Sequence, residues 1–460
     1  MSDEQKNQIS EQTAEEEKTL PEEPAEPAPQ PEQPHEPEQA PQAPQKPEQT
    51  ETLPKEPKPV PDNLIQLPED PLIRERRERR KKGLLVLAGA LLIAVIVLLF
   101  VLFPETFDFD AIRRYFYYMG KRERDSFGMI GFDAAGSNDF APLGDGMALG
   151  TEGGLYYYDL SGNQVSMVQS TVASPRLIAN EKLALCYAMG SGYIAIINEN
   201  GERQMDQTLN GIFLDADLSS DGYICYNLTE DGYKTVATVL NVNHEPIYRY
   251  RSSTQYLNAC AVSEGGGYLA VAGLTEEDSS FNSTLTILKT DEEIIAGTDQ
   301  SQSAKRRLDL GNQVVYEMAF LSRNRLCVIA QDALLILDTD CSVIAEMPYD
   351  DTYLRGFGIS EDGYVVLLLG QSMTGDRYTI RSVDKNGDIL GEIEFNRSVR
   401  SMDVRGRYIG ILTDGELLLY REHLQEYRTS DRTGTAMRVL MRSDGTALLV
   451  SNGAAQLYIP

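Results

Sequence analysis

The stretch SEDGYVVLLLG, residues 360–370, contains the pattern that decides the fold. An acidic turn that ends in glycine is followed by a short apolar run. Asp-Gly between apolar runs is a strong hairpin signal, because the turn needs residues that tolerate a positive φ. The same unit recurs as SSDGYICYN (219–227), SEGGGYLAVAG (263–273), RGRYIGIL (405–412) and SDGTALLV (443–450). Short strands separated by such turns predict an all-β fold.

The spacing of the units predicts a β-propeller. The first strands of the units begin near Phe140, Pro175, Phe213, Tyr256, Val314, Tyr353, Ser401 and Thr435. The mean period is about 42 residues, which is the length of a four-stranded propeller blade. Eight blades are favoured, and seven remain an alternative. Stacked β-sandwich domains would repeat after about 90–100 residues, and the sequence shows no such longer period.

The last unit contains only three β-like runs, AMRVLMR (436–442), TALLVS (446–451) and AAQLYIP (454–460). A blade needs a fourth strand, and the run FGMIGF (127–132) belongs to no other unit. We therefore expect residues 127–132 to complete the last blade. Ring closure would then remove the exposed sheet edges that an open array must protect.

Residues 83–103 form a run of 21 residues without charge or proline. A helix of that length spans roughly 31 Å, the thickness of the hydrocarbon core of a bilayer. The apolar part of a cleaved signal peptide would be shorter, about 7–15 residues. We interpret the run as an uncleaved signal anchor and a single transmembrane helix.

A basic segment, residues 74–82, immediately precedes this run. Its seven cations are Arg74, Arg76, Arg77, Arg79, Arg80, Lys81 and Lys82. Because Lys and Arg next to a span stay on the cytoplasmic side, they predict a cytoplasmic N-terminus and an extracytoplasmic C-terminal domain in the cell membrane. Five cations beyond the span oppose this orientation, namely Arg113, Arg114, Lys121, Arg122 and Arg124, but the inner cluster is denser and closer.

Residues 1–73 contain 16 of the 22 prolines and are strongly acidic. They lack the apolar residues that could offset the entropy of ordering, so we expect a disordered cytoplasmic tail. Prolines recur every third residue, as in Pro21, Pro24 and Pro27, which is the period of polyproline II. A semi-rigid spacer is the main interpretation, and a proline-reading cytoplasmic partner is the alternative.

Residues 104–125 form a stalk between the span and the domain at 126–460. Ile112, Tyr115, Phe116 and Met119 recur at the spacing of one helix face, and Arg113, Arg114 and Lys121 lie off that face. Aromatic and basic side chains just outside a span suit the membrane interface. Packing of this helix beneath the domain is an equal alternative.

The unit EGGLYYYDLSG (152–162) resembles the repeat of quinoprotein-like propellers, in which a Gly-led apolar strand ends in Asp and a Gly turn. The whole layout also resembles a bacterial family of unknown function with a Pro- and acid-rich head, a basic run, one span and a propeller-like outer domain. That family implies no activity. The sequence contains no Trp, unlike the Trp-bearing repeats of quinone enzymes, so we expect no cofactor.

Candidate chemical groups are sparse. His244 and His423 lie in polar turns far apart in sequence, which argues against a zinc site or a His-based nucleophile system. The Asp pairs 215/217 and 350/351 leave open a carboxylate-dependent enzyme or a calcium site. The five cysteines have no CxxC spacing and four lie in apolar runs, so buried thiols are expected.

One unit is longer than the rest, because 58 residues separate Tyr256 from Val314. The excess falls in the polar stretches 275–283 and 291–307. Loops tolerate insertions and concentrate function, so the second stretch is expected to be either a tolerated insertion or an arm that binds a partner.

The net charge of −28 disfavours nucleic acid as a partner, since that binding depends on cations that neutralise phosphates. We hypothesise a membrane-anchored binding or scaffolding module of the cell envelope, which contacts a protein or envelope partner through its propeller loops. The alternative is a glycosidase- or lyase-type enzyme acting on an envelope polysaccharide. Carboxylates converging in the central channel would favour the enzyme, and an apolar or aromatic patch on the rim would favour binding.

Overall fold

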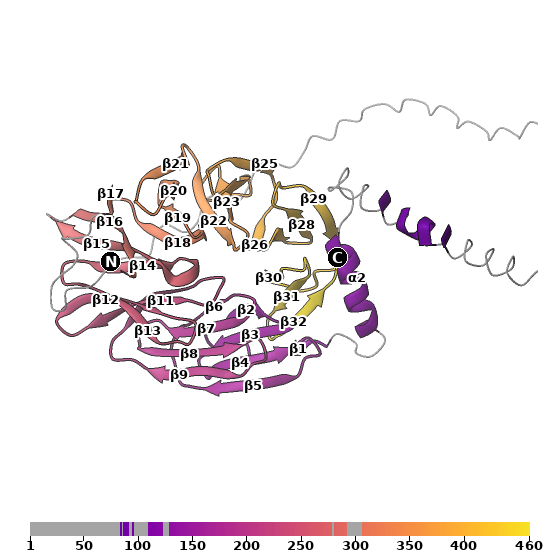
Figure 1. Cartoon of the computed structure of the whole chain (residues 1–460), viewed down its shortest axis with the longest axis horizontal. Coiled ribbons are helices and arrows are strands. Elements are labelled where there is room, and N and C mark those ends of the chain that lie inside the picture. Colours follow the sequence, from indigo (N-terminus) through magenta and orange to yellow (C-terminus); the bar gives the residue numbers. More distant parts are fainter. Residues whose placement is uncertain are drawn as a thin grey trace, which may run out of the picture. The chain divides into compact units, whose positions relative to one another are not determined.

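The computed structural model describes residues 83–84, 86–91, 94–95, 109–122, 128–277, 280–291 and 306–460. Within it, eight four-stranded antiparallel sheets form a closed ring (Figure 1). The chain is therefore an all-β, eight-bladed β-propeller, and the alternative of seven blades is excluded.

Blades 1 to 7 each use four consecutive strands, from the innermost to the outermost. Their bounds are β2 (Asp139–Leu143), β3 (Gly146–Thr151), β4 (Gly154–Asp159) and β5 (Gln164–Gln169); β6 (Pro175–Ala179), β7 (Leu183–Ala188), β8 (Tyr193–Asn198) and β9 (Arg203–Thr208); β10 (Phe213–Leu218), β11 (Ile224–Glu230), β12 (Tyr233–Leu240) and β13 (Pro246–Ser252); β14 (Tyr256–Val262), β15 (Tyr268–Glu277), β16 (Ser280–Lys289) and β17 (Arg307–Gly311); β18 (Val315–Ser322), β19 (Arg325–Ala330), β20 (Ala333–Leu337) and β21 (Val343–Pro348); β22 (Tyr353–Ser360), β23 (Tyr364–Gly370), β24 (Tyr378–Asp384) and β25 (Ile389–Phe395); β26 (Val399–Arg405), β27 (Tyr408–Thr413), β28 (Leu417–Arg421) and β29 (Glu426–Ser430).

Blade 8 joins the two ends of the propeller. It consists of β30 (Arg438–Met441), β31 (Ala447–Ser451), β32 (Ala454–Tyr458) and, as its outermost strand, β1 (Ile130–Gly131). Ile130 pairs with Ala455, and Gly131 pairs with Ala454. The predicted closure of the ring by residues 127–132 is therefore confirmed, although the paired part is only two residues long.

The hydrophobic core is divided into eight clusters, and each cluster lies between two neighbouring blades. Because both faces of the middle strands are covered, these strands are continuously apolar, as in β23 (YVVLLLG), where all residues are buried. Outer strands face water on one side, and β9 (RQMDQT) is almost entirely exposed. This difference explains why the strongest sequence signal came from the middle strands.

The innermost strands run parallel to one another around the channel. Asp215 and Asp217 of β10 accept hydrogen bonds from the backbone N–H groups of Cys260 and Val262 of β14, so both bonds join residues 45 positions apart in the sequence. Ser401 and Asp403 of β26 accept from two backbone N–H groups of β30 in the same way, 38 positions apart. The ring therefore has two distinct faces. We call the face where the innermost strands begin the rim face, and the face where they end the helix face.

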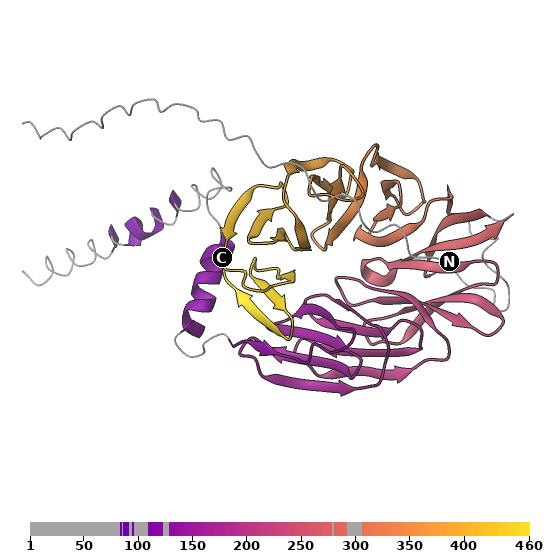
Figure 2. The same ribbon diagram turned by 180° about the vertical axis from the view of Figure 1, so that it is seen from behind.

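Helix α2 (Phe109–Arg122) packs against the helix face beside blades 8 and 1, and both views show it next to the last blade (Figures 1 and 2). Tyr118 is buried in the cluster that joins these two blades. Its hydroxyl donates to Asp444 Oδ2 at 2.7 Å. Arg114 donates to the Asp444 carbonyl at 2.6 Å and lies over the Tyr408 ring.

In the first polar stretch of the long unit, residues 275–277 and 280–283 are strand rather than loop. Strands β15 and β16 have ten residues each, and Thr275 to Glu277 pair with Asn282 to Ser280. The second stretch lies largely outside the described residues. The tail at 1–73 and the basic segment at 74–82 also lie outside them.

The apolar run at 83–103 is described at residues 83–84, 86–91 and 94–95, which are helical. Within the residues that the structure describes, no helix combines the length and the apolar character needed to cross a bilayer.

Candidate binding sites in the channel and on the rim

The central channel contains a cavity of about 680 Å³ lined by the innermost strands of blades 1 to 7. Its polar wall includes Arg176 of β6, Asp215 and Asp217 of β10, and Glu317 of β18. The innermost strands are less apolar than the middle ones because their side chains face this cavity. Carboxylates therefore converge in the channel, which is the arrangement that would favour an enzyme.

Asp215 and Asp217 join blade 3 to blade 4. Asp215 Oδ2 accepts the N–H of Cys260 at 2.8 Å, and Asp217 Oδ2 accepts the N–H of Val262 at 2.9 Å. Asp139 Oδ2 accepts the N–H of Leu177 at 3.0 Å in the same way between blades 1 and 2. These inner-strand carboxylates serve as hydrogen-bond acceptors for the backbone of the next blade.

Burial in the channel raises the pKa values of its carboxyl groups. Burial raises the pKa of Asp215 to about 7, although the N–H of Cys260 opposes the shift. Burial likewise raises the pKa of Asp217 to about 6. The pKa of Glu317 rises to about 8 because of burial and the nearby charges of Asp215 and Asp217, while Arg176 opposes the shift. These four side chains, contributed by three blades, form one electrostatically coupled group.

Arg405 crosses the channel toward its helix-face end. It belongs to blade 7, yet its Nη1 donates to the carbonyl of Ala179 in blade 2 at 3.0 Å. Its Nε lies 3.5 Å from Glu181 Oε1 and 3.5 Å from Glu361 Oε1, so this side chain of blade 7 contacts blades 2 and 6. The side chain is 12% exposed. Arg405 therefore ties together opposite parts of the ring.

The rim face presents apolar and aromatic side chains from consecutive blades. We define the aromatic rim as Ile212, Tyr256, Val314, Tyr316 and Tyr353, which lie within one residue of the starts of the innermost strands of blades 3 to 6. Their exposed fractions range from 37% for Val314 to 52% for Tyr256. Exposed apolar residues concentrated at one entrance are typical of a contact surface.

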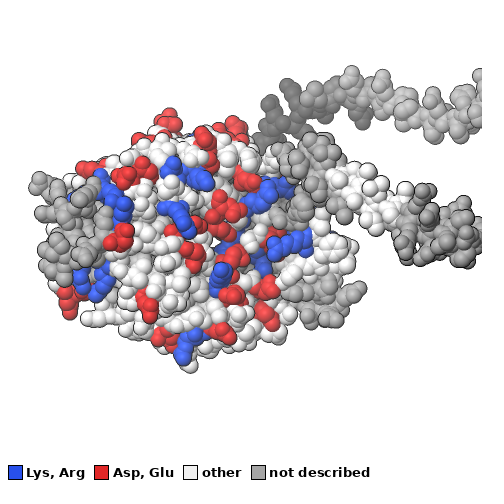
Figure 3. Space-filling model, viewed as in Figure 1, with Lys and Arg blue, Asp and Glu red and all other residues white. Residues whose placement is uncertain are grey.

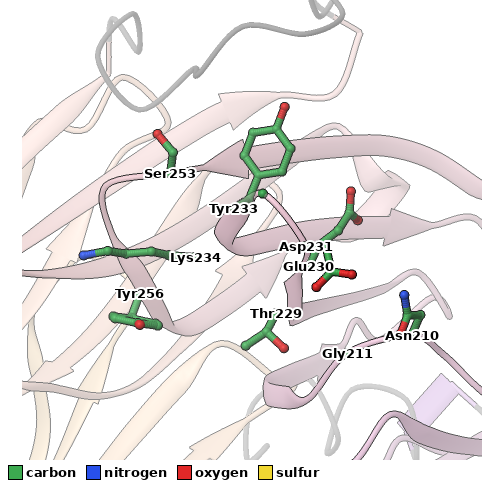
Figure 4. Close-up of a pocket in the computed structure, with 10 residues that line it drawn as sticks. Asn210, Gly211, Thr229, Glu230, Asp231, Tyr233, Lys234, Ser253 and Tyr256 are labelled. Atoms are coloured by element: carbon green, nitrogen blue, oxygen red, sulfur yellow. The ribbon is translucent and has the colours of Figure 1, made fainter.

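A pocket of about 510 Å³ adjoins this rim between blades 3 and 4 (Figure 4). Lys234 lies over the Tyr256 ring, with Nζ 5.0 Å from the ring centroid. Glu230 forms ion pairs with Arg249 and Arg251. The pocket thus combines a cation, carboxylates and an aromatic side chain at the rim face of the propeller.

Residues 129–453 match the model of the Family of unknown function (DUF5711). The chain belongs to this family. The family resemblance expected from the layout of the sequence is thereby supported for the propeller. No curated protein matches the chain.

Solved structures similar to this member of the DUF5711 family are propellers of low sequence identity. BamB from Moraxella catarrhalis is 14% identical, with 72% of this chain and 98% of that chain covered and a TM-score of 0.43. The C-terminal WD40 domain of Sif2 is 11% identical, with 73% and 100% covered and a TM-score of 0.48. The blade count of this DUF5711 propeller rests on its own strand pairing.

The other candidate groups are separated in the DUF5711 propeller. Asp350 and Asp351 are exposed in the loop before β22, as their turn pattern indicated. His244 lies in the β12–β13 turn, where burial lowers its pKa, and His423 lies in a turn of blade 7. Among the described residues, no group of three or more His, Cys, Asp or Glu side chains could hold a metal ion.

All five cysteines are buried and none forms a disulfide, so the expectation of buried thiols is confirmed.

The sequence did not point to Glu317, Arg176 or Arg405. Each of these residues belongs to a different innermost strand, and only the ring brings them together. A channel-facing position on an innermost strand was the available signal, but it required knowledge of which strands were innermost. The basic residues from Arg74 to Lys82, which were predicted to set the orientation in the membrane, lie outside the described residues.

Proposed function

We propose that this protein is a membrane-tethered, extracytoplasmic propeller that binds a protein or envelope partner at its rim face. The aromatic rim is the observation that carries the proposal. It is contributed by four consecutive blades and adjoins the pocket that contains Lys234 and Tyr256. An apolar or aromatic rim favours a binding module, whereas the carboxylates in the channel are the feature that favours an enzyme.

The tether rests on the basic segment at 74–82 and the uncharged run at 83–103. With the N-terminus inside, the propeller stands on the extracytoplasmic side of the cell membrane. Basic and acidic side chains are intermingled on the face of the molecule seen in Figure 3. Such a mixed surface lacks the broad cationic area that nucleic-acid binding needs.

A photocrosslinking amino acid at Tyr256 tests the binding site in living cells. We expect an adduct of defined mass at Tyr256 and none at Ile344, a control position on outer strand β21 that is 40% exposed. Equal adducts at both positions, or none at Tyr256, would contradict binding through the rim.

Reporters fused before residue 74 and after residue 460 test the orientation of the chain in the membrane. The first reporter should be active in the cytoplasm and the second outside it.

A carboxylate-dependent enzyme acting on an envelope polysaccharide is a second candidate, because Asp215, Asp217 and Glu317 converge in the channel. With a pKa of about 8, Glu317 would be protonated at neutral pH and could act as a general acid. Against this role, Asp215 and Asp217 each hold a backbone N–H of the next blade. Release of sugar from purified cell-wall polysaccharide, abolished by Glu317→Gln, would establish the enzyme.

A further inference from the structure

Helix α2 presents two opposite faces, and the face that docks on the propeller is its polar one. Arg114 and Tyr118 are buried at 6% and 2% exposure, and Tyr117 donates to Asp145 Oδ2 at 2.6 Å. These three positions follow the spacing of one side of a helix. The propeller therefore holds α2 through hydrogen bonds to Asp444 and Asp145 on the helix face and through burial of the Tyr118 ring between blades 8 and 1.

The apolar stripe of α2, which we define as Ile112, Tyr115, Phe116 and Met119, points away from the propeller. The exposed fractions are 44%, 63%, 66% and 47%. A helix that packed beneath the domain as a simple stalk would bury this stripe and expose its polar side. The observed orientation is the reverse, so the stripe is free for a different apolar environment.

We propose that this stripe lies in the outer membrane–water interface and seats the helix face of the propeller on the lipid bilayer. The proposal rests on the membrane tether proposed above. The apolar run ends at residue 103 and α2 begins at Phe109, with five residues between them. Five residues reach at most about 20 Å when extended, so α2 must start close to the end of the span.

The composition of the stripe suits lipid rather than a protein partner. Tyr115 and Phe116 are aromatic residues next to the proposed span. Arg113 instead lines a pocket against the propeller, together with Asp145 and Glu199. The same arrangement determines which face of the propeller points away from the membrane. With the helix face on the membrane, the aromatic rim at the opposite ends of the innermost strands faces away from it.

The absence of Trp from the whole chain allows a direct test, because one introduced Trp is the only indole in the protein. Single-Trp variants of the full chain would be reconstituted in vesicles of phosphatidylcholine and phosphatidylglycerol, with and without bromine on the acyl chains. Phe116→Trp and Tyr115→Trp report on the stripe. Leu91→Trp reports on the span. Phe281→Trp, on the β15–β16 hairpin at 63% exposure, is the matched propeller control.

An interfacial helix buries its apolar face about 5–10 Å into the headgroup–acyl boundary. We therefore expect bromolipids to remove about half of the fluorescence of Phe116→Trp and Tyr115→Trp, more from Leu91→Trp, and almost none from Phe281→Trp. Quenching at Leu91 with none on the stripe would overturn the inference and leave the tether standing. No quenching at Leu91 would overturn the tether as well. A blue-shifted but unquenched stripe Trp would mean that protein covers the stripe, which also overturns the inference.

Discussion

Asp215 and Asp217 show how one residue type serves both structure and electrostatics in the channel wall. Each directs one oxygen at a backbone N–H of blade 4, so a carboxylate that would be costly to bury finds a defined partner. The same cavity contains Glu317, whose pKa is raised by burial and further by the charges of Asp215 and Asp217. Asp350 and Asp351 form an equally acidic pair in sequence, but they are solvated residues of an exposed loop.

The raised pKa of Asp215 makes stability depend on pH. An Asp in the unfolded chain titrates near 3.9, whereas Asp215 titrates at about 7 in the folded protein. The folded state therefore binds protons more tightly, and the stability associated with Asp215 is fully present below pH 4 and is lost as the pH rises through about 7. We expect the contribution of Asp215 to the free energy of unfolding to fall by an amount on the order of 2 kcal/mol between about pH 5 and 8. The raised pKa values of Asp217 and Glu317 add a change of the same sign.

Asp215→Asn should reduce this pH slope, because the Asn oxygen can still accept the N–H of Cys260 but cannot ionise. Urea unfolding of the full chain in detergent at several pH values measures the slope. Asp350→Asn is the control, since Asp350 is exposed and its φ of 51° suits Asn. Equal slopes for the wild type and Asp215→Asn would refute the assignment of the pH dependence to this carboxyl group.

At the scale of elements, β1 shows that a strand of two residues can close a ring. Ile130 is 1% exposed and packs in the cluster between blades 8 and 1, together with Tyr118 of α2. The backbone of Phe132 extends the contact by donating to the Gly453 carbonyl at 3.0 Å. The strand thus acts less through its few ladder bonds than through one deeply buried side chain.

Ile130→Ala should destabilise the propeller by about 2–4 kcal/mol, because it removes a buried apolar side chain at the closing blade. Met129→Ala changes the neighbouring residue, which is 67% exposed, and should have an effect within about 0.5 kcal/mol. Thermal melting of the two variants provides the comparison. Indistinguishable melting temperatures would show that β1 does not hold the ring closed.

The turn that receives α2 provides a second test at this scale. A Cβ at Gly445 would lie 2.4 Å from Arg114 Nη1 and 2.8 Å from the Tyr408 ring, and φ is +78°. Gly445→Ala should therefore combine backbone strain of about 1 kcal/mol with loss of the docked position of Arg114. Gly232→Ala imposes a similar strain at a φ of +89°, but no atom lies within 4 Å of the added Cβ.

We expect trypsin to cleave α2 at Arg114 much faster in Gly445→Ala than in the wild type, with Gly232→Ala close to the wild type. Mass spectrometry of the first fragments measures the cleavage site. Equal protection of Arg114 in both variants would mean that α2 stays docked without this contact.

At the scale of the whole molecule, Arg405 is a contact that no single blade could contain. Blades 7 and 2 are not neighbours, and their interaction exists only because the closed ring brings them to the same end of the channel. The guanidinium is largely shielded from water and links its own blade to blades 2 and 6, so its loss leaves Glu181 and Glu361 without this cation.

Arg405→Ala should lower the free energy of unfolding by about 2 kcal/mol, the range for a hydrogen-bonded charged group that loses its partners. Arg397→Ala removes a surface ion pair with Glu416, in which both side chains are more than 40% exposed, and should cost less than about 1 kcal/mol. Denaturant midpoints of the two variants measure the difference. A midpoint for Arg405→Ala equal to that of Arg397→Ala would exclude the cross-channel role.

Short stretches of sequence were sufficient to predict the propeller architecture, because every blade repeats the same pattern of short strands and turns. Pro175, Phe213, Tyr256 and Tyr353 were expected as strand starts and are the observed starts of β6, β10, β14 and β22. The unassigned run at 127–132 was enough to predict closure, since a three-stranded blade leaves an open edge. The stripe of α2 was also visible in the sequence, but periodicity could not tell which side of the helix docks.

The amino-acid sequence by itself determined the repeat, a propeller of eight blades or seven, the strand that closes the ring and the amphipathic character of α2. These features depend on contacts between near neighbours along the chain. Only the tertiary structure decided that Arg176, Asp215 and Glu317 share one cavity, that Arg405 spans the ring, and that α2 turns its apolar stripe outward. Those outcomes depend on which distant blades the closed ring brings together, and no local pattern encodes such distances.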